Sequence, residues 1–563
     1  MKRVLVIAAA AGMLAFPASA LAHAALLRTI PAASGEVDTS PRFVGLVYSE
    51  AVEPRFAIVS VTDAAGRRQT AGSPHRSAAN PDELQVPLRP LRQGWYLVVW
   101  RVISVDGHPV RGAYTFAVGP NPGPSPAFVI PSLSETAATP TLVAARWIVF
   151  LSLLCAIGLF IFRMIVVRPL RGPPRALTVA FWAAVAVSLV AVPMYTLLAT
   201  ASFALRSFWS FGALIPLLRT SAFGRGYLDL ELMLALFALA AGLALWLNRP
   251  GRQQRSVAEL LALAGALLAA GAALVAPGAS GHAGQTSPRW LALTLDWAHL
   301  AAASLWLGGL VGLLVLWRSL PGASRLAGLA VCVPRFSKLA FASVTVLLAT
   351  GVGAAVIHLP TLGSLWHTSY GQAIVVKASL LLAAMLVASG NLLKTTPALR
   401  RADPPLSAAV LLRRLVSGEI VLVTAAVAVA AVLSSVAPPP KALASVGSAS
   451  AHAGPGPIAS VFEESGYRLE LHVEPNRAAV PNDFTVRITR GGTPLRGADV
   501  TATFTMLDML MPAQSYKLDE TAPGEYARST AALVMVGHWG ISLQVTPRAG
   551  KPFSAVLVDR AGG

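Results

Sequence analysis

Residues 141–165 read TLVAARWIVFLSLLCAIGLFIFRMI, an apolar run long enough to cross the hydrocarbon core of a bilayer as one helix. Similar runs recur through the middle of the chain, separated by short polar connections. The predicted helices lie near 141–165, 176–198, 227–247, 256–277, 292–316, 337–357, 371–393 and 415–437. The sequence therefore predicts a polytopic bundle of about eight transmembrane helices within residues 141–438, embedded in a lipid bilayer.

Composition agrees with a membrane protein, because 55% of the 563 residues are hydrophobic and only 13% are charged. The net charge of +19 would ordinarily indicate a nucleic-acid partner. The basic residues collect instead in the connections after the first, third, fifth and seventh helices: Arg168, Arg171, Arg175, Arg249, Arg252, Arg255, Arg318, Arg325, Arg335, Lys338, Lys394, Arg400, Arg401, Arg413 and Arg414. The connections after helices two, four and six hold only Arg206, Arg219, Arg225 and Arg289. The positive-inside rule places the first set in the cytoplasm, so topology explains the charge and no nucleic-acid partner is expected.

Residues 1–22 are typical of a secretory signal peptide, with Lys2 and Arg3 before an apolar core and an Ala20-Leu21-Ala22 cleavage motif. Cleavage would make His23 the first residue of the mature chain. An exported N-terminus and an even number of helices place both ends of the chain outside. We expect a bacterial inner-membrane protein with its N- and C-terminal domains on the periplasmic, external side.

Two stretches outside the helices alternate apolar and polar residues in short runs, separated by Gly and Pro. Residues 23–120 predict a β-sandwich or small barrel, and residues 461–563 predict an immunoglobulin-like β-sandwich. Linkers are expected at 121–140 and 439–460. The fold class is therefore a multi-domain membrane protein with two exported β domains.

The clearest chemical signal pairs His23 with the Asp106-Gly107-His108 turn. An N-terminal histidine offers its amine and its ring, and the turn adds an imidazole and a carboxylate. This nitrogen and oxygen set suits Cu(II), and the absence of methionine between His23 and Pro140 leaves no thioether for Cu(I). The alternative is a processed terminus that happens to start with His, together with an ordinary surface turn.

The N-terminal region closely resembles the CopC family of periplasmic copper-binding proteins, which have a cupredoxin-like, immunoglobulin-like β-barrel. The matching segments are His23-Ala24-Ala25-Leu26, Pro31-Ala32-Ala33-Ser34-Gly35, Tyr48-Ser49-Glu50 and the run from Trp100 to Val110. The resemblance implies that His23, Asp106 and His108 are Cu(II) ligands, with Glu50 a nearby contributor. A second, methionine-rich Cu(I) site of some CopC members is not expected here.

The membrane region resembles the CopD family through looser motifs in family order. These are Ser280-Gly281-His282-Ala283, Asp296-Trp297-Ala298-His299, Trp306-Leu307-Gly308-Gly309, Phe336-Ser337, Thr350-Gly351-Val352, Tyr370-Gly371, Lys377 and Glu419. The resemblance implies copper import.

The membrane histidines are informative without any family. His282, His299, His358 and His367 all map to the external half of the bundle. Asp296 and His299 share a helix face at i, i+3. Imidazoles suit copper, and Met194 would add a soft ligand. We take His282 and His299 as candidate metal or pathway residues. For His358 and His367, the alternative is a position at the membrane interface with no ligand role. For Lys377 and Glu419, the alternative is that they form a charge pair.

The C-terminal domain resembles YtkA-like domains through the run Met506 to Met511, the Pro523-Gly524-Glu525-Tyr526 turn and Met535 to Trp539. Met509 and Met511 share one strand face, and thioethers prefer Cu(I). Met509, Met511 and His538 are the candidate ligands. The alternative is that the methionines fill the core.

Three classes of function remain open at this stage. The first is copper binding and transport, with copper chaperones as possible partners. The second is a haem-containing membrane oxidoreductase that reduces copper, and the third is a non-transporting copper scavenger. We expect that the protein is not an enzyme. The chain has neither the D-K-T-G motif of a P-type ATPase nor a P-loop. The two cysteines, Cys155 and Cys332, are expected to be idle thiols rather than a disulfide or a metal site.

Overall fold

The computed structural model describes residues 26–33, 35–48, 52–103, 109–123, 126, 139–170, 172, 174–248, 254–286, 288–359, 361–367, 369–401, 405–436, 451–478, 480–507 and 513–562. Within them, eight helices are long and apolar enough to cross a membrane. Each begins or ends close to the apolar run from which it was predicted. The prediction of a polytopic bundle is confirmed.

Helix bounds follow the chain order. The helices are α2 (Pro140–Ile161), α3 (Arg175–Phe203), α4 (Phe211–Thr220), α5 (Ala222–Leu247), α6 (Val257–Ala279), α7 (His282–Gln285), α8 (Arg289–Ser319), α9 (Gly322–His358), α10 (Ser364–His367), α11 (Ser369–Gly390), α12 (Thr396–Leu399) and α13 (Leu406–Leu433). Two π-helical turns, η2 (Phe162–Val166) and η3 (Asn391–Thr395), continue α2 and α11. Helix α9 begins at Gly322 rather than near residue 337, so Cys332 lies buried inside a helix and not in a basic connection.

Glycine allows a very close contact between α2 and α8. Gly158 of α2 lies against Gly308 of α8, where a Cβ on Gly158 would stand 1.9 Å from the Ser304 carbonyl oxygen. The two backbones therefore touch directly, and α2 also packs against α3 and α13. Phe160, Phe181 and Phe237 fill the space between α2, α3 and α5.

The N-terminal domain is two four-stranded sheets. One has the order β1 (Leu26–Ile30), β3 (Phe43–Tyr48), β6 (Glu83–Pro87), β5 (His75–Arg76), and the other the order β2 (Glu36–Val37), β8 (Pro109–Val118), β7 (Gly94–Ile103), β4 (Ile58–Asp63). A short 3-10 turn, η1 (Pro54–Phe56), precedes β4. Every second residue of β3 and β7 is buried in the core between the two sheets, and Trp100 of β7 belongs to this core.

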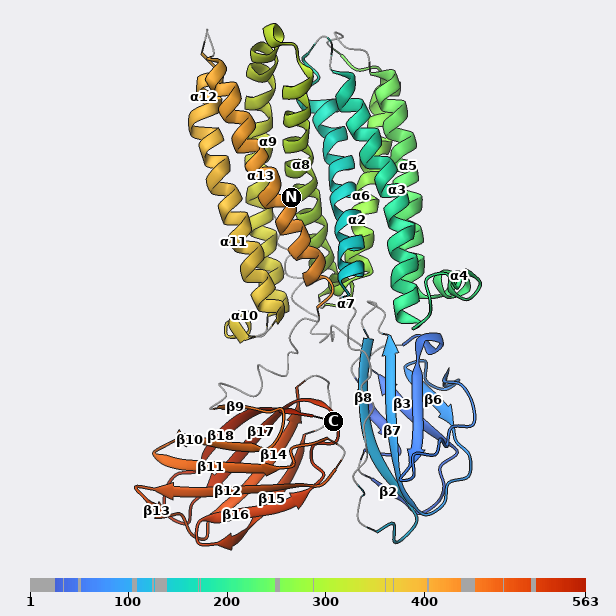
Figure 1. The fold of residues 1–563 in the computed structure, drawn as a ribbon, viewed down its shortest axis with the longest axis vertical. Helices are drawn as coiled ribbons and strands as arrows, with labels where there is room; N and C mark the ends of the chain where they lie inside the picture. Colours follow the sequence, from blue (N-terminus) through green and yellow to red (C-terminus); the bar gives the residue numbers. More distant parts are fainter. Residues whose placement is uncertain are drawn as a thin grey trace, which may run out of the picture.

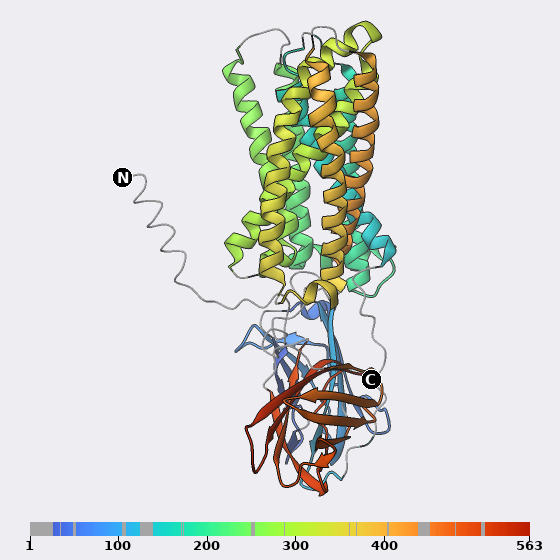
Figure 2. The same ribbon diagram turned by 90° about the vertical axis from the view of Figure 1, so that its left-hand side faces the viewer.

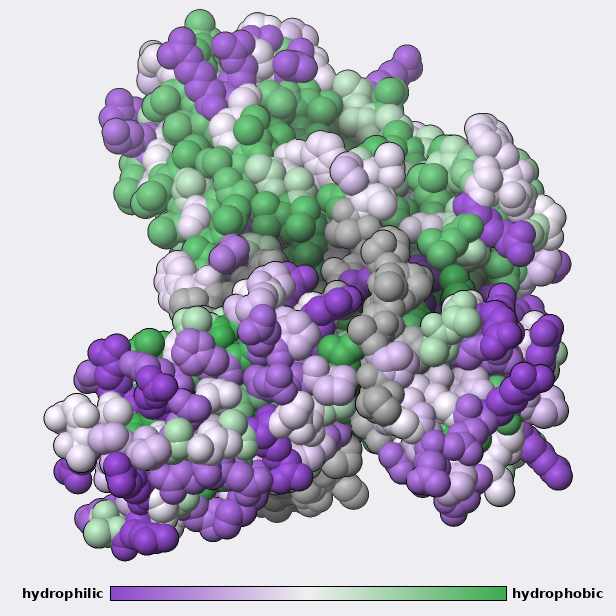
Figure 3. All heavy atoms as spheres, turned by 60° about the horizontal axis from the view of Figure 1, so that its bottom comes forward, coloured by the Kyte–Doolittle hydropathy of each residue, from purple (hydrophilic) through white to green (hydrophobic). Residues whose placement is uncertain are grey.

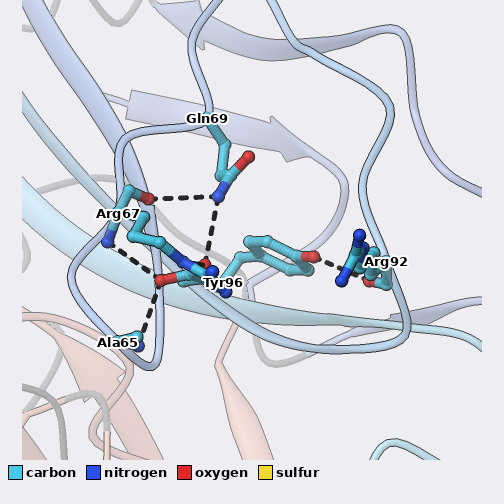
Figure 4. A network of polar contacts seen from close by, with 6 residues as sticks. Ala65, Arg67, Gln69, Arg92 and Tyr96 are labelled. Atoms are coloured by element: carbon cyan, nitrogen blue, oxygen red, sulfur yellow. Dashed lines mark hydrogen bonds and ion pairs between the residues drawn. The ribbon is translucent and has the colours of Figure 1, made fainter.

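A polar network closes the turn after β4 (Figure 4). The Asp63 carboxylate accepts hydrogen bonds from the Ala65 and Arg67 amides at 3.0 and 2.9 Å, and from Arg67 Nε at 2.8 Å. Burial of the carboxyl acts to raise its pKa, but the hydrogen bonds from Arg67 outweigh it, so the pKa of Asp63 is lowered. Tyr96 Oη donates to the Arg92 carbonyl at 2.7 Å in the same corner. Asp63 pairs with Tyr96 and Ile58 with Arg101, so this network is at one end of the sheet and Arg101 is near the other.

The C-terminal domain is a nearly closed antiparallel barrel. Its hydrogen-bonded order is β10 (Ile458–Glu464), β11 (Tyr467–Glu474), β12 (Asn482–Arg490), β16 (Glu525–Thr530), β15 (Gln514–Ala522), β14 (Asp499–Met506), β17 (Gly537–Thr546), β18 (Phe553–Ala561), β9 (Ala451–Ala453), with β13 (Thr493–Pro494) beside β12. Among the named strands that the structure describes in this domain, β18 and β9 are the pair that runs parallel. Strand β9 arises from the stretch expected to be linker.

Figures 1 and 2 show the two β domains at one end of the helical bundle. The connections that follow α2, α5, α8 and α11 lie at the opposite end (Figure 1). Figure 3 shows the hydrophobic surface of the bundle against the hydrophilic surface of the two domains. The arrangement places both domains on the same face, as the helix count predicts.

Candidate functional site

Two strand ends of the N-terminal domain, from β1 and β3, meet at Trp100 of β7. Leu26, the first residue of β1, pairs with Tyr48, the last residue of β3. The Tyr48 ring packs edge-on against Trp100 of β7, with ring centroids 5.8 Å apart, and Gly112 of β8 pairs with Trp100. Three of the strands therefore converge where β7 approaches its end.

The predicted copper ligands of this domain are close in sequence to the ends of β1, β3, β7 and β8. His23, Glu50, Asp106 and His108 lie outside the described residues. His23 comes three residues before Leu26, and Glu50 comes two residues after Tyr48. Asp106 and His108 belong to the five residues that join Ile103 to Pro109. A residue of extended chain spans about 3.3 Å, so each ligand is attached within about 10 Å of a described strand end.

Two hydrogen-bond donors are orphaned at the same place. Tyr48 Oη and Trp100 Nε1 are buried and have no hydrogen-bond partner among the residues that the structure describes. Burial raises the pKa of the Tyr48 phenol well above its ordinary value, so the hydroxyl keeps its proton. Buried donors without an acceptor are costly, so an acceptor for each is expected outside the described residues.

The same end of the N-terminal domain docks on the bundle. Arg101 of β7 donates from Nη1 to the Phe203 carbonyl at the end of α3, at 3.0 Å, in a buried position. Phe56 packs edge-on against Phe203 at 6.3 Å. Ile103, the last described residue before the predicted ligands, is buried in the hydrophobic core of the bundle. The end of β7 is therefore held against the membrane domain.

A cavity of about 410 Å³ lies inside the bundle, lined by residues of seven of its long helices. Phe223 lines it and packs against Phe203 at 5.0 Å. Phe203, which contacts the N-terminal domain, therefore also contacts Phe223 in the wall of the cavity. The polar side chains that line the cavity include Arg146, Tyr227, Ser280, Asp296, His299, Thr350, His358, Tyr370, Lys377 and Ser434.

His299 of α8 is held on both ring nitrogens. Nε2 lies 3.3 Å from Lys377 Nζ of α11, and Nδ1 lies 2.9 Å from Thr350 Oγ1 of α9. An ammonium group can only donate, so Nε2 is the acceptor and Nδ1 carries the proton. Thr350 Oγ1 then donates onward to the Val346 carbonyl at 2.7 Å. His299 is a neutral imidazole in one defined tautomer, and its basic nitrogen is covered by Lys377.

Asp296 faces the same cavity one turn earlier on α8. Its Oδ2 lies against Gly278 of α6, where an added Cβ would stand 2.4 Å away. The carboxylate and the Lys377 ammonium attract each other across the cavity. The expected pairing of Asp296 with His299 on one helix face is confirmed by the cavity lining.

The other membrane histidines differ in position. The side chains of His282 and His367 lie outside the described part, although Gly281 and Ala283 on either side of His282 both line the cavity. His358 Nδ1 is 3.5 Å from Thr286 Oγ1. Met194 is 49% exposed on the outer face of α3, so the expectation of a soft ligand there is wrong.

Sequence reasoning missed Arg146, which stands in the first apolar run. Its Nε donates to Tyr195 Oη at 2.9 Å and its Nη1 to Ser435 Oγ at 2.6 Å. No carboxylate lies within ion-pair distance of it among the described residues. A cation on an apolar helix usually faces a bundle interior or pathway, and that signal was present in the sequence.

Glu419 and Lys377 are not a pair. Glu419 of α13 is 2% exposed, accepts a hydrogen bond from Asn391 Nδ2 in the π-helical turn η3 and also interacts with Trp306. Trp306 lines the cavity. This second polar cluster therefore adjoins the cavity through one side chain.

In the C-terminal domain, Met509 and Met511 lie outside the described residues. His538 of β17 is exposed, and its carbonyl accepts from the Leu507 amide at 2.8 Å. His538 is thus beside the start of the segment that carries both methionines. Met506 and Met535 are buried in the core. Within the described part of the chain, no three His, Cys, Asp or Glu side chains are grouped closely enough to hold a metal ion.

The fold and these sites define a multi-pass membrane protein whose N-terminal β domain is docked beside a largely apolar cavity that contains a few polar groups. Comparison with known families matches the CopC domain at residues 26–119, copper resistance protein D (CopD) at 330–433 and a YtkA-like domain at 463–544. The chain belongs to the CopC–CopD proteins, with CopC, CopD and YtkA-like domains in one polypeptide. This is a copper transport and resistance family and not a catalytic one.

Individual relatives cover different parts of the chain. The copper transport protein CutJ of Bacillus subtilis is 28% identical over 65% of this chain and 67% of its own length. Protein YobA of Escherichia coli K12 is 38% identical over 18% of this chain and 82% of its own length. The crystal structure of CopC from Methylosinus trichosporium OB3b is 36% identical and covers 17% of this chain and 95% of that one, with a TM-score of 0.17.

Proposed function

We propose that this protein captures copper with its N-terminal domain and passes it into the bundle cavity for import across the membrane. Copper is the cargo in this proposal and not a resident cofactor. The observation that carries it is the docking of the end of β7 and of η1 on the bundle, through Arg101, Ile103 and Phe56, beside the cavity wall. Because the proposed donor residues Asp106 and His108 follow Ile103 directly in the chain, copper would need only a short transfer distance.

In the proposed donor site, the His23 amine and ring, the His108 ring and the Asp106 carboxylate hold Cu(II), with Glu50 nearby. This set of nitrogen and oxygen donors suits Cu(II) rather than Cu(I). The orphaned donors Tyr48 Oη and Trp100 Nε1 support it, because both would gain acceptors from the carboxylates.

The proposed receiving site in the bundle is formed by His282 and His299, with Asp296 close by. Gly281, Ala283, Asp296 and His299 all line one cavity, which supports a shared site at the outer ends of α6, α7 and α8. His299 becomes a ligand only when Lys377 leaves Nε2, because a hydrogen-bonded lone pair cannot also coordinate a metal.

The face that carries both β domains is taken to be periplasmic. The signal peptide and the basic residues at the opposite end support this orientation. The metal gradient, the membrane potential or protons would drive import. The C-terminal domain is proposed to bind Cu(I) through Met509, Met511 and His538, and copper chaperones are proposed partners on either side.

Cellular copper distinguishes import from scavenging. Cells that express the full chain should contain more copper than cells without it at equal external copper. Lower or equal copper in the spheroplasts, with copper retained outside the inner membrane, would contradict import and favour a scavenger. A Soret band in the purified protein would favour the haem oxidoreductase instead.

A further inference from the structure

The cavity is much larger than a copper ion needs. Its volume is about 410 Å³, whereas a water molecule occupies about 30 Å³ of liquid. Most of the lining is apolar, including Phe150, Leu154, Leu347 and Ile374. Cavities of this size with apolar walls and a few convergent polar groups are typical of small organic ligands.

The charges in the cavity oppose a bare cation. Arg146 and Lys377 are both positive, and Asp296 is the only carboxylate among the described lining residues. Arg146 is bound by the hydroxyls of Tyr195 and Ser435, which orient its guanidinium without neutralising it. Repulsion between like charges is strong where water is excluded, so a Cu(II) aqua ion is disfavoured and an anion is favoured.

The imidazole of His299 is not open to a metal in this arrangement. Lys377 Nζ covers Nε2 at 3.3 Å, and Thr350 occupies Nδ1. An anion that attracted Lys377 would uncover Nε2. The cavity therefore contains a nitrogen ligand that an arriving carboxylate would release.

We propose that the cavity accepts copper as a complex with a small organic polycarboxylate, whose carboxylate groups bind Arg146 and Lys377. The inference rests on the function proposed above and specifies the form in which its cargo enters. In the binding step a carboxylate of the complex pairs with the Lys377 ammonium, and the freed His299 Nε2 replaces one oxygen ligand of Cu(II). No proton leaves Lys377 and copper keeps its oxidation state.

Radiolabelled citrate tests the proposal on the full chain in lipid nanodiscs, because citrate retention is independent of copper bound elsewhere. Citrate is offered alone and as its Cu(II) complex, and Cu(II) is offered separately as a cationic ammine complex. We expect the Cu(II) citrate complex to be retained, and Arg146→Gln to weaken its retention at least ten-fold. Arg146→Lys, which keeps the charge, should restore part of the affinity.

The matched control is Arg225→Gln, on an exposed position of α5 at the same end of the bundle. It should bind as the wild type does. Equal loss in the Arg146 and Arg225 variants would indicate general surface charge and overturn the proposal. Copper uptake from the ammine complex into proteoliposomes, without citrate retention on the nanodiscs, would overturn this inference and leave the proposed import intact. Absence of uptake into proteoliposomes from every copper form would contradict the import itself.

Discussion

Asp559 is a carboxyl group that folding buries completely, on strand β18 of the C-terminal barrel. Burial raises its pKa to about 6, although Asn476 Nδ2 donates to Oδ1 at 2.9 Å and opposes the shift. The ordinary value is about 3.9, so the folded domain binds more protons between these two pKa values. The contribution of Asp559 to the free energy of unfolding is therefore most favourable below pH 4 and becomes less favourable as the pH rises toward 6. Above pH 6 it stays at this lower level.

Asp559→Asn should remove this loss of stability. We expect slower hydrogen exchange in β17 and β18 at pH 7.5, which corresponds to a rise of roughly 1–3 kcal/mol in the free energy of opening. This free energy should also depend less on pH between 4 and 7 than it does in the wild type. Exchange measured by mass spectrometry on the full chain checks it. Asp499→Asn, at an exposed position of β14, is the control and should change little. Faster exchange in the Asp559 variant at pH 7.5 would contradict the account.

The N-terminal amine is the second residue-scale feature. If the mature chain begins at His23 and uses its amine and ring together, one added alanine before His23 should lower Cu(II) affinity by orders of magnitude. The extra residue separates the amine from the ring. Titration against a competing chelator and the EPR spectrum measure the change, and an unchanged affinity and spectrum would rule out this ligand set. Acid should also weaken binding, because imidazoles coordinate only when neutral.

Elements of the bundle depend on close backbone contact. Gly158→Ala would place a Cβ 1.9 Å from the Ser304 carbonyl oxygen of α8. Alanine is intrinsically better than glycine in a helix by about 1 kcal/mol, but overpacking typically costs about 1–3 kcal/mol. Backbone atoms cannot move aside as a side chain can, so we expect the overpacking cost to exceed the gain in helix propensity. The melting temperature in detergent should therefore fall.

Gly265→Ala is the matched control in α6, where the nearest atom to an added Cβ is 3.8 Å away. It should leave stability unchanged or raise it. Equal melting temperatures for the two variants would show that the α2–α8 contact is not as tight as described.

Elements with a strong apolar pattern were predictable from the sequence. The eight spans and strands such as β3 and β7 follow directly from hydrophobic length or alternation. Strands β15 and β16 show no such pattern, because few of their side chains are buried. The start of α9 was missed because its first turns carry Arg325, Arg335 and Lys338, which are typical of a connection.

The candidate site was predictable in part. Asp296 and His299 were recognised from their spacing, but the sequence does not say which distant residues meet them. Lys377 and Thr350 reach His299 from α11 and α9, and Arg146 reaches the cavity from α2. These contacts depend on the packing of four helices, α2, α8, α9 and α11, which the local sequence pattern does not encode. The roles of the predicted ligands remain predictions.

At the scale of the whole molecule, both β domains share one face and the basic connections share the other. Single cysteines at the exposed positions Ser73 and Ser324 report this arrangement in intact cells, because the native Cys155 is largely enclosed and Cys332 is buried. A membrane-impermeant maleimide should label Ser73→Cys from outside and Ser324→Cys only after lysis. Labelling of Ser324→Cys in intact cells would reverse the proposed orientation.

Transport through the cavity is the central claim, and copper uptake into proteoliposomes tests it most directly. The full chain should accumulate copper inside the vesicles, measured by mass spectrometry after external metal is removed. His299→Leu, inserted normally and with unchanged Cu(II) binding by its N-terminal domain, should accumulate no more than empty vesicles. Wild-type accumulation by this variant would contradict the account and leave His299 as a structural residue of the bundle.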